Sequence, residues 1–159
     1  MKHGGGSVMV WGCMTAHGVG FLCRIHSRMD AELYCNILED ELMNSMTYYE
    51  MEKAKTLFQQ DNDPKHTSKK ALKCLQDLEL NVLGWSSQSS DLNPIEHLWA
   101  ILKRKLDSYS YKPDGVEELW ERIVVEWNKI TKEQCLALIS SMPRRIKEVL
   151  KAKGRHTKY

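Results

Sequence analysis

The order in which strand-like and helix-like segments alternate constrains the fold of this 159-residue chain more than any other feature. Two short apolar segments, 7–13 and 20–25, are joined by Ala16-His17-Gly18, which predicts a β-hairpin. From residue 30 onward, apolar residues recur at helical spacing, and these stretches alternate with short strand-like runs. The resulting order, β-β-α-β-α-β-α followed by helices, is typical of an α/β fold, a mixed sheet with helices packed on it.

Residues with strong capping and turn preferences mark where these segments begin and end. Asp30 stands at the N-cap position of the first expected helix. The apolar residues of that helix are Leu33, Tyr34, Ile37, Leu38 and Leu42. Residues 56–60 form a short expected strand, which leads directly into the turn sequence Asp61-Asn62-Asp63-Pro64.

A second helix is expected from about Thr67, followed by a strand over 81–85 and a polar loop over 86–90. The apolar face of this helix is expected to comprise Leu72, Leu75 and Leu78. Asn93 as N-cap and Pro94 at the first helical position then predict a further helix. Its apolar residues are Ile95, Leu98, Trp99, Leu102 and Leu106.

Three more helices are expected in the rest of the chain. The first carries an apolar stripe over 116–127, the second opens with the capping box Thr131-Lys132-Glu133-Gln134, and the third runs over about 143–154. We therefore divide the chain into a sheet-containing part, 1–111, and a C-terminal helical extension of the same domain, 112–159.

The composition is that of a soluble globular protein, with 42% hydrophobic and 28% charged residues. The net charge of +2 is too small to indicate a nucleic-acid partner by itself. Basic residues nevertheless gather in 143–159, which contains seven Lys or Arg and a single acidic residue, Glu148. Such a segment suits phosphate contacts, and a solvated basic helix end explains it equally well.

The five cysteines are widely scattered and include no Cys-x-x-Cys pair. This spacing fits neither a disulfide framework nor a zinc site, so it predicts reduced thiols in an intracellular compartment. No apolar run approaches the roughly 18–20 residues of a membrane span, and no signal-peptide pattern follows the N-terminus. We therefore expect no membrane partner.

Asp61 and Glu96 are the strongest candidates for a metal site. Asp61 follows a strand, where an α/β sheet projects side chains into its ligand crevice, and Glu96 lies in the first turn of a helix. The 34 residues between them supply a helix and a strand, about the length needed to bring both to one sheet edge. Carboxylate oxygens suit Mg²⁺, and a pair of such ions promotes phosphodiester chemistry.

Both carboxylates also have structural interpretations, which the spacing leaves open. Glu96 follows Asn93 by three residues, a capping arrangement that is favourable at the positive end of a helix. The residues Asp61-Asn62-Asp63-Pro64 also suit a turn in which Asp and Asn side chains bond to their own backbone. Asp63 is the more structural of the two acids, because a residue before proline is pushed toward extended geometry.

Longer motifs around these carboxylates are more specific than the spacing. The segments Phe58-Gln-Gln-Asp-Asn-Asp-Pro-Lys-His-Thr-Ser68 and Gln88-Ser-Ser-Asp-Leu-Asn-Pro-Ile-Glu-His-Leu-Trp99 closely resemble the two signature segments of Tc/mariner transposases. Three further parts are similar to that family: Val8-Met-Val-Trp-Gly-Cys13, Met29-Asp30, and the ending Ser141-Met-Pro-Arg-Arg145 with Lys151-Ala-Lys-Gly154. The resemblance covers nearly the whole chain.

The resemblance implies a ribonuclease-H-like domain whose Asp-Asp-Glu triad binds two Mg²⁺ or Mn²⁺ ions. It also implies DNA cleavage at transposon ends and strand transfer to a target. By match of motif, Asp61 corresponds to the second triad carboxylate and Glu96 to the third. The residues expected to contact DNA are Lys65, His66, Lys103, Arg104, Arg144 and Arg145. For His66 the alternative stays open that a polar histidine has no role in binding.

This sequence departs from the family pattern at its beginning. The first triad aspartate belongs to the first strand of the fold, upstream of the hairpin, and this sequence starts at the hairpin. Asp30 is no substitute, because it matches another family position and its N-cap role explains it. The helix-turn-helix modules that recognise transposon ends are also absent, and Ser86 and Ser90 stand where the family usually has prolines.

The missing first strand is central in a ribonuclease-H-like sheet, so the hairpin and the Asp61 strand are each expected to present an unpaired edge. We expect the isolated chain to be poorly stable, re-paired across the gap, or paired with a second copy or with the missing N-terminal segment. With one carboxylate lost, weak metal binding and no strand transfer are expected.

Two other functions remain open from the sequence. One is a non-catalytic nucleic-acid-binding module that uses Lys103-Arg104-Lys105 and the basic C-terminal segment. The other is a decayed transposon copy without a function of its own. A nuclear location is expected from the resemblance alone.

Overall fold

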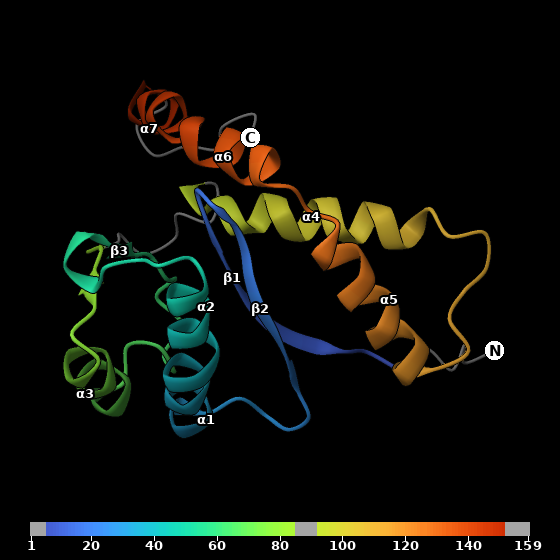
Figure 1. Ribbon diagram of the computed structural model, residues 1–159, viewed down its shortest axis with the longest axis horizontal. Coiled ribbons are helices and arrows are strands. Elements are labelled where there is room, and N and C mark those ends of the chain that lie inside the picture. The colour runs from blue at the N-terminus through green and yellow to red at the C-terminus, as the bar shows by residue number, and fades with distance from the viewer. Residues whose placement is uncertain (1–5, 85–91, 152–159) are drawn as a thin grey trace.

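The computed structural model describes residues 6–84 and 92–151, and its centre is a long β-hairpin (Figure 1). Strand β1 (Met9–Thr15) pairs antiparallel with β2 (Gly18–Ile25), from Met9 opposite Ile25 to Thr15 opposite Gly18, with an irregularity between Gly12 and Met14. The turn uses Gly18 at φ 142°, a conformation that side chains disfavour. The predicted hairpin is therefore confirmed, although β1 begins and ends two residues later than expected.

A helical segment follows the hairpin in three continuous parts: α1 (Ala31–Ile37), a π-helical stretch η1 (Leu38–Leu42) and α2 (Met43–Tyr48). The predicted N-cap is confirmed, because the Asp30 side chain accepts a hydrogen bond from the Leu33 backbone N–H at 2.8 Å. The wider π-helical turns keep Leu38 and Leu42 buried along the face that α1 begins.

The predicted strand-helix-strand unit is present, but its strands are very short. After the 3₁₀ turn η2 (Lys53–Lys55), β3 (Leu57–Phe58) pairs in parallel with β4 (Asn81–Val82), and α3 (Lys69–Asp77) connects them. The expected end of the second strand, Trp85, lies outside the described residues, as does the loop 86–90.

One predicted helix face is wrong in part. Leu75 of α3 is buried, but Leu72 is 54% exposed, and the core is reached by Ala71 and Cys74 instead. At about 100° per residue, Leu72 is turned away from the face that Ala71 and Leu75 share. The small Ala71 and Cys74 let α3 approach α1 closely.

The strands of the described part form two separate two-stranded sheets, β1-β2 and β3-β4. In that part of the chain no ladder joins β1 to β3, so re-pairing across the gap, one of the three alternatives expected, does not occur in this structure. The predicted α/β class is confirmed, since helices pack around these two small sheets.

Four helices complete the fold: α4 (Pro94–Asp107), α5 (Val116–Asn128), α6 (Lys132–Ser140) and α7 (Met142–Lys151). The capping box of α6 is confirmed, since Thr131 Oγ1 accepts from the Gln134 N–H at 3.3 Å and Gln134 Oε1 accepts from the Thr131 N–H at 2.9 Å. Asn93 precedes α4 as predicted, but its side chain makes no capping hydrogen bond. The predicted end of the last helix, Gly154, is outside the described residues.

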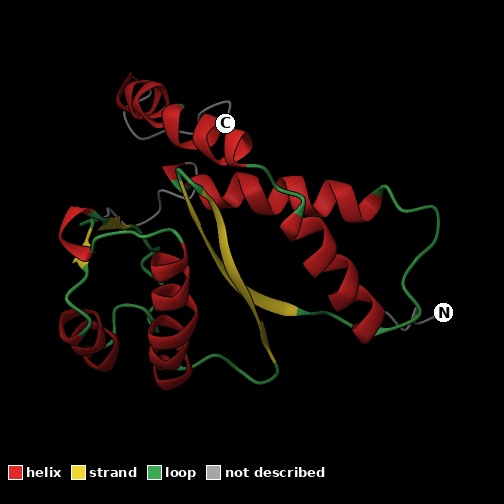
Figure 2. Ribbon diagram, in the orientation of Figure 1, coloured by secondary structure: helices red, strands yellow, loops and turns green. Residues whose placement is uncertain are grey.

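The hairpin separates two hydrophobic cores, as Figure 2 shows with helices on either side of the yellow strands. The first lies between α1, η1, α2 and α3, and Trp11 and Cys13 of β1 face it. The second lies between α4, α5 and α6, and Val8, Val10 and Met14 face it. Strand alternation thus directs successive β1 residues to opposite cores, and this alternation continues through the irregularity between Gly12 and Met14.

Residues 6–84 and 92–151 contain no helix that is both long and apolar enough to cross a membrane.

Candidate active site

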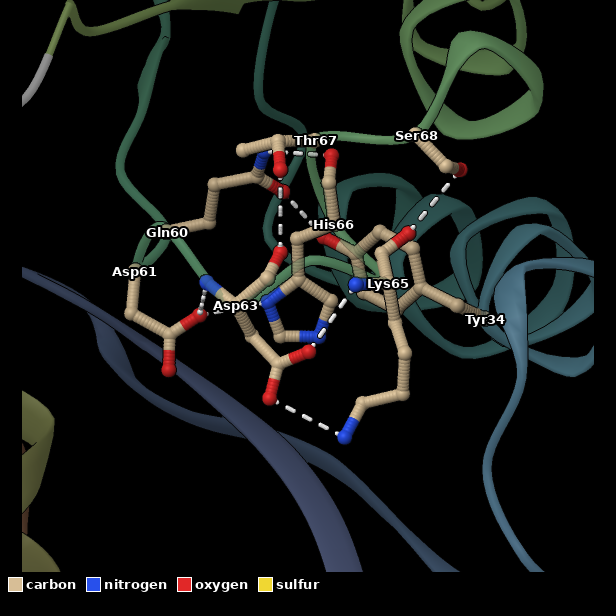
Figure 3. A network of polar contacts seen from close by, with 8 residues as sticks. All are labelled: Tyr34, Gln60, Asp61, Asp63, Lys65, His66, Thr67 and Ser68. Carbon is tan, nitrogen blue, oxygen red and sulfur yellow. Dashed lines mark hydrogen bonds and ion pairs between the residues drawn. The ribbon is translucent and has the colours of Figure 1, made fainter.

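Asp61 lies at the start of the loop that leaves β3, where the polar network in Figure 3 is centred. Its Oδ1 accepts a hydrogen bond from the Asp63 backbone N–H at 3.1 Å and lies 2.5 Å from His66 Nδ1. Within the described residues, Oδ2 accepts no hydrogen bond. The turn bonding that the sequence suggested is therefore present, and it occupies only one of the two carboxylate oxygens.

Asp63 organises the same loop from the other side. Its Oδ1 accepts from the Lys65 N–H at 2.9 Å, its Oδ2 pairs with Lys65 Nζ at 3.0 Å, and its carbonyl accepts from the His66 N–H at 2.8 Å. Burial opposes ionisation, but the hydrogen bonds and charge of Lys65 outweigh it and lower the pKa of the Asp63 carboxyl. Asp63 is thus the structural acid of the pair, as its position before proline indicated.

Tyr34, a buried residue of α1, packs against this loop. Its ring lies against the His66 ring, with centroids 4.1 Å apart, and its hydroxyl donates to Gln60 Oε1. Gln60 Nε2 in turn donates to the His66 carbonyl at 3.3 Å. Burial, with the nearby charge of Asp61, raises the pKa of Tyr34, so the phenol stays protonated and remains a donor.

Glu96 lies in the first turn of α4 with its side chain exposed. It borders a cavity of about 610 Å³ that Asp61 and His66 also line. The cavity walls come from β1, from the β3 segment 56–61, and from the start of α4 at 93–96. The fold therefore brings the two candidate carboxylates to one cavity, although 34 residues separate them in sequence.

Gln59 connects the two carboxylate-bearing segments directly. Its Nε2 donates to the Leu92 carbonyl at 3.3 Å, which links the residues after β3 to the residue before the N-cap of α4. Gln59, Gln60 and Tyr34 were all missed as site residues by the sequence reasoning. The two glutamines lie in the signature segment around Asp61, whereas nothing in the sequence marks Tyr34 apart from its place on an apolar helix face.

The donor chemistry of this cavity fits a divalent cation in part. Asp61 keeps one carboxylate oxygen out of the loop bonding, and exposed Glu96 supplies another hard oxygen donor. Across 6–84 and 92–151, however, no group of three or more His, Cys, Asp or Glu side chains is placed to hold a metal ion. An ion held by Asp61 and Glu96 therefore needs further ligands beyond these two carboxylates.

The residues predicted to contact DNA are spread over three places. Lys65 pairs with Asp63, and the His66 side chain is 15% exposed beside Asp61. Lys103 and Arg104 are exposed on α4, about 10–12 Å along the helix from Glu96 at 1.5 Å per residue. Arg144 is exposed on α7, whereas Arg145 is only 5% exposed, so this structure does not present Arg145 to a ligand surface.

Comparison with known proteins identifies a family and several relatives of this chain. The model of the DDE superfamily endonuclease family matches residues 2–120. The Tc1 transposase of Caenorhabditis elegans is 43% identical over 161 residues, and the Tcb1 transposase of Caenorhabditis briggsae is 42% identical over 159 residues. All of this chain is covered in both cases, but it spans only 57% of the length of either relative.

Solved structures agree on the fold. The Mos1 transposase catalytic domain, solved with raltegravir and Mg, superposes with a TM-score of 0.83 at 21% identity, over 95% of this chain and 77% of the other. This likeness confirms the predicted ribonuclease-H-like fold with its incomplete sheet. The family model, which matches 119 residues, confirms the family that the motifs indicated. The chain belongs to the DDE superfamily endonuclease family, and it is similar in sequence to part of the Tc1 transposase and in fold to the Mos1 transposase catalytic domain.

Proposed function

We propose that this chain is the part of a DNA transposase catalytic domain that supplies two of its metal-binding carboxylates, Asp61 and Glu96, for DNA cleavage and strand transfer. The observation that carries the proposal is their convergence on one cavity. Each comes from a different element, and neither is neutralised there by an ion pair with Lys or Arg among the described residues. Such a pair of carboxylates is suited to binding cations.

Mg²⁺ or Mn²⁺ is the proposed cofactor, since the similar Mos1 catalytic domain was solved with each of these metals. When bound, a pair of such ions activates the attacking oxygen and stabilises the leaving one in phosphodiester chemistry. The residues of this chain would hold the ions through Asp61 Oδ2 and the Glu96 carboxylate. The loop bonds of Asp63, Lys65 and His66 would keep Asp61 in place.

DNA is the proposed substrate, since Mos1 has been solved in a paired-end complex with a transposon end. On this chain, Lys103, Arg104 and Arg144 are exposed cations that suit phosphate contacts. A nuclear location is proposed on the same ground, and imaging of the tagged protein tests it.

A β-strand from the longer protein is the proposed partner of this chain. The cavity lies between β1 and β3, each of which has a single strand neighbour among the described residues. The relatives are longer than this chain, and their extra length is the source that we propose for the strand. Such a strand would pair with both edges and, as the family resemblance implies, bring the remaining carboxylate.

A plasmid-nicking assay tests the function with two lengths of the protein. We expect no Mg²⁺-dependent nicking or strand transfer by the 159-residue chain. We expect cleavage by a form extended at its N-terminus by the corresponding segment of the relatives. Glu96→Gln should abolish that cleavage, and Glu121→Gln, an exposed carboxylate on α5, should leave it unchanged.

Two outcomes would contradict the proposal. Nicking by the 159-residue chain that disappears in Glu96→Gln would show that no further carboxylate is needed. Salt-dependent DNA binding without metal-dependent cleavage by the extended form, unaffected by Asp61→Asn, would indicate a binding module instead.

A further inference from the structure

The Asp61 carboxylate has two oxygens in different surroundings, and His66 is responsible for much of that difference. Oδ1 is engaged by His66 Nδ1 at 2.5 Å and by the Asp63 N–H at 3.1 Å. Oδ2 points away from the network (Figure 3). A carboxylate held at one oxygen by two donors cannot rotate about its last side-chain bond without losing both contacts.

His66 is itself restrained on several sides, so it has a fixed direction in which to donate. The Tyr34 ring covers one face at 4.1 Å, the Gln60 amide holds its carbonyl at 3.3 Å, and the Asp63 carbonyl holds its N–H at 2.8 Å. Its side chain is 15% exposed, whereas that of Asp61 is 57% exposed. The largely buried His66 ring therefore holds the exposed Asp61 carboxylate, which is the proposed metal ligand.

We propose that His66 is a positioning residue for Asp61, a role different from the DNA contact that the sequence suggested. In this role the ring carries its proton on Nδ1 and donates it to Asp61 Oδ1, which presents Oδ2 to the cavity. The proposal rests on the proposed function of Asp61 as a metal ligand. Donors that orient a ligating carboxylate are worth about 10- to 100-fold in metal affinity.

The ring tautomer tests the contact without any metal. Nitrogen NMR of the full chain, at alkaline pH where an ordinary imidazole is neutral, distinguishes Nδ1–H from Nε2–H. We expect His66 to show Nδ1–H. An Nε2–H tautomer would overturn the proposal, because Nδ1 would then have no proton to donate to the carboxylate.

A Mn²⁺ titration tests the effect of His66 on metal binding. The measured quantity is the Mn²⁺ concentration at which paramagnetic broadening halves the intensity of the NMR resonances of the Asp61 loop. We expect His66→Ala to raise this concentration about tenfold. His66→Asn, whose amide nitrogen can occupy the Nδ1 position, should restore it to within about twofold of the wild type. The matched control is His26→Ala, an exposed histidine after β2, which should change nothing.

The variants separate the two proposals from each other. If the loop does not broaden in the wild type, or broadens equally in Asp61→Asn, the proposed metal site is wrong. If Asp61→Asn abolishes the broadening and His66→Ala leaves it unchanged, His66 has no positioning role. If His66→Asn is as weak as His66→Ala while both remain folded by their amide spectra, the ring acts as a ligand and not as a positioning donor.

Discussion

The size of single residues decides how closely neighbouring elements approach one another. Gly20 of β2 is one such position, because a Cβ there would meet the Cys13 sulfur and lie 2.5 Å from Ser45 Oγ of α2. The same Ser45 Oγ accepts from the Phe21 N–H at 2.8 Å and donates to the Glu41 carbonyl at 2.6 Å. The hairpin therefore packs on α2 through backbone, without room for a methyl group.

Gly20→Ala should destabilise the protein by about 1–3 kcal/mol, because the added methyl overpacks the contact between β2 and α2. Gly84→Ala is the matched control, since a Cβ at Gly84 would meet no heavy atom within 4 Å. Urea denaturation of both variants measures the difference. Equal stability of the two variants would show that the hairpin and α2 are not packed in this way.

At the scale of elements, two side-chain contacts fasten the hairpin to α5. Trp127 Nε1 donates to the Gly20 carbonyl at 2.9 Å, and Trp127 stacks on Trp99 of α4. Arg24, near the end of β2, makes a two-pronged pair with Glu117 at 2.7 and 2.8 Å. The C-terminal helices are thereby tied to the hairpin that forms one wall of the cavity.

The Arg24–Glu117 pair should give a specific pH dependence. The hydrogen bond from Arg24 lowers the pKa of Glu117 in the folded state, so the pair stabilises the fold above the ordinary glutamate pKa of about 4.3. This contribution is lost as the pH falls through the lower, folded-state pKa. The difference in unfolding free energy between wild type and Glu117→Gln should thus be present near neutral pH and vanish in acid.

The measurement is urea denaturation of both proteins across the acid range, at low and high salt. High salt should shrink the neutral-pH difference, because the glutamate is largely exposed. Glu121→Gln on the same helix controls for loss of a surface charge. A wild-type minus Glu117→Gln difference that persists unchanged into acid would mean that the carboxylate does not pair with Arg24 in solution.

At the scale of the whole molecule, the main feature is the cavity between β1 and β3. Two cores lie on either side of the hairpin, and β3 and β4 pair over only two residues each. Among the described residues β1 pairs only with β2, so its other edge leaves backbone donors and acceptors beside an apolar wall that includes Trp11, Met29 and Phe58. The candidate site therefore lies beside the shortest strand pairing among the described residues.

We expect the 159-residue chain to unfold at low temperature in a broad transition or to self-associate through these edges. Addition of the N-terminal segment of the relatives should raise and sharpen the transition, because a strand in the cavity pairs with both edges. Calorimetry with analytical ultracentrifugation measures both properties. A sharp, cooperative transition of a monodisperse monomer of the 159-residue chain would contradict this expectation.

Much of this fold is predictable because its signals are local. The hairpin, the Asp30 cap and the Thr131–Gln134 capping box each depend on residues within a few positions of one another, and all three form as predicted. The face of α3 was harder to predict, since the choice between Leu72 and Ala71 depends on how closely α1 approaches. The motifs around Asp61 and Glu96 identified the family from sequence.

The arrangement around the carboxylates was decided only by the tertiary structure. The sequence marked Asp61 and Glu96 by type and spacing, and both line the same cavity. It could not show that Tyr34 supports His66, that Gln59 links β3 to the start of α4, or that Arg145 is buried. Local chemistry determines caps and turns, whereas contacts between residues 30 or more positions apart depend on the packing of whole elements.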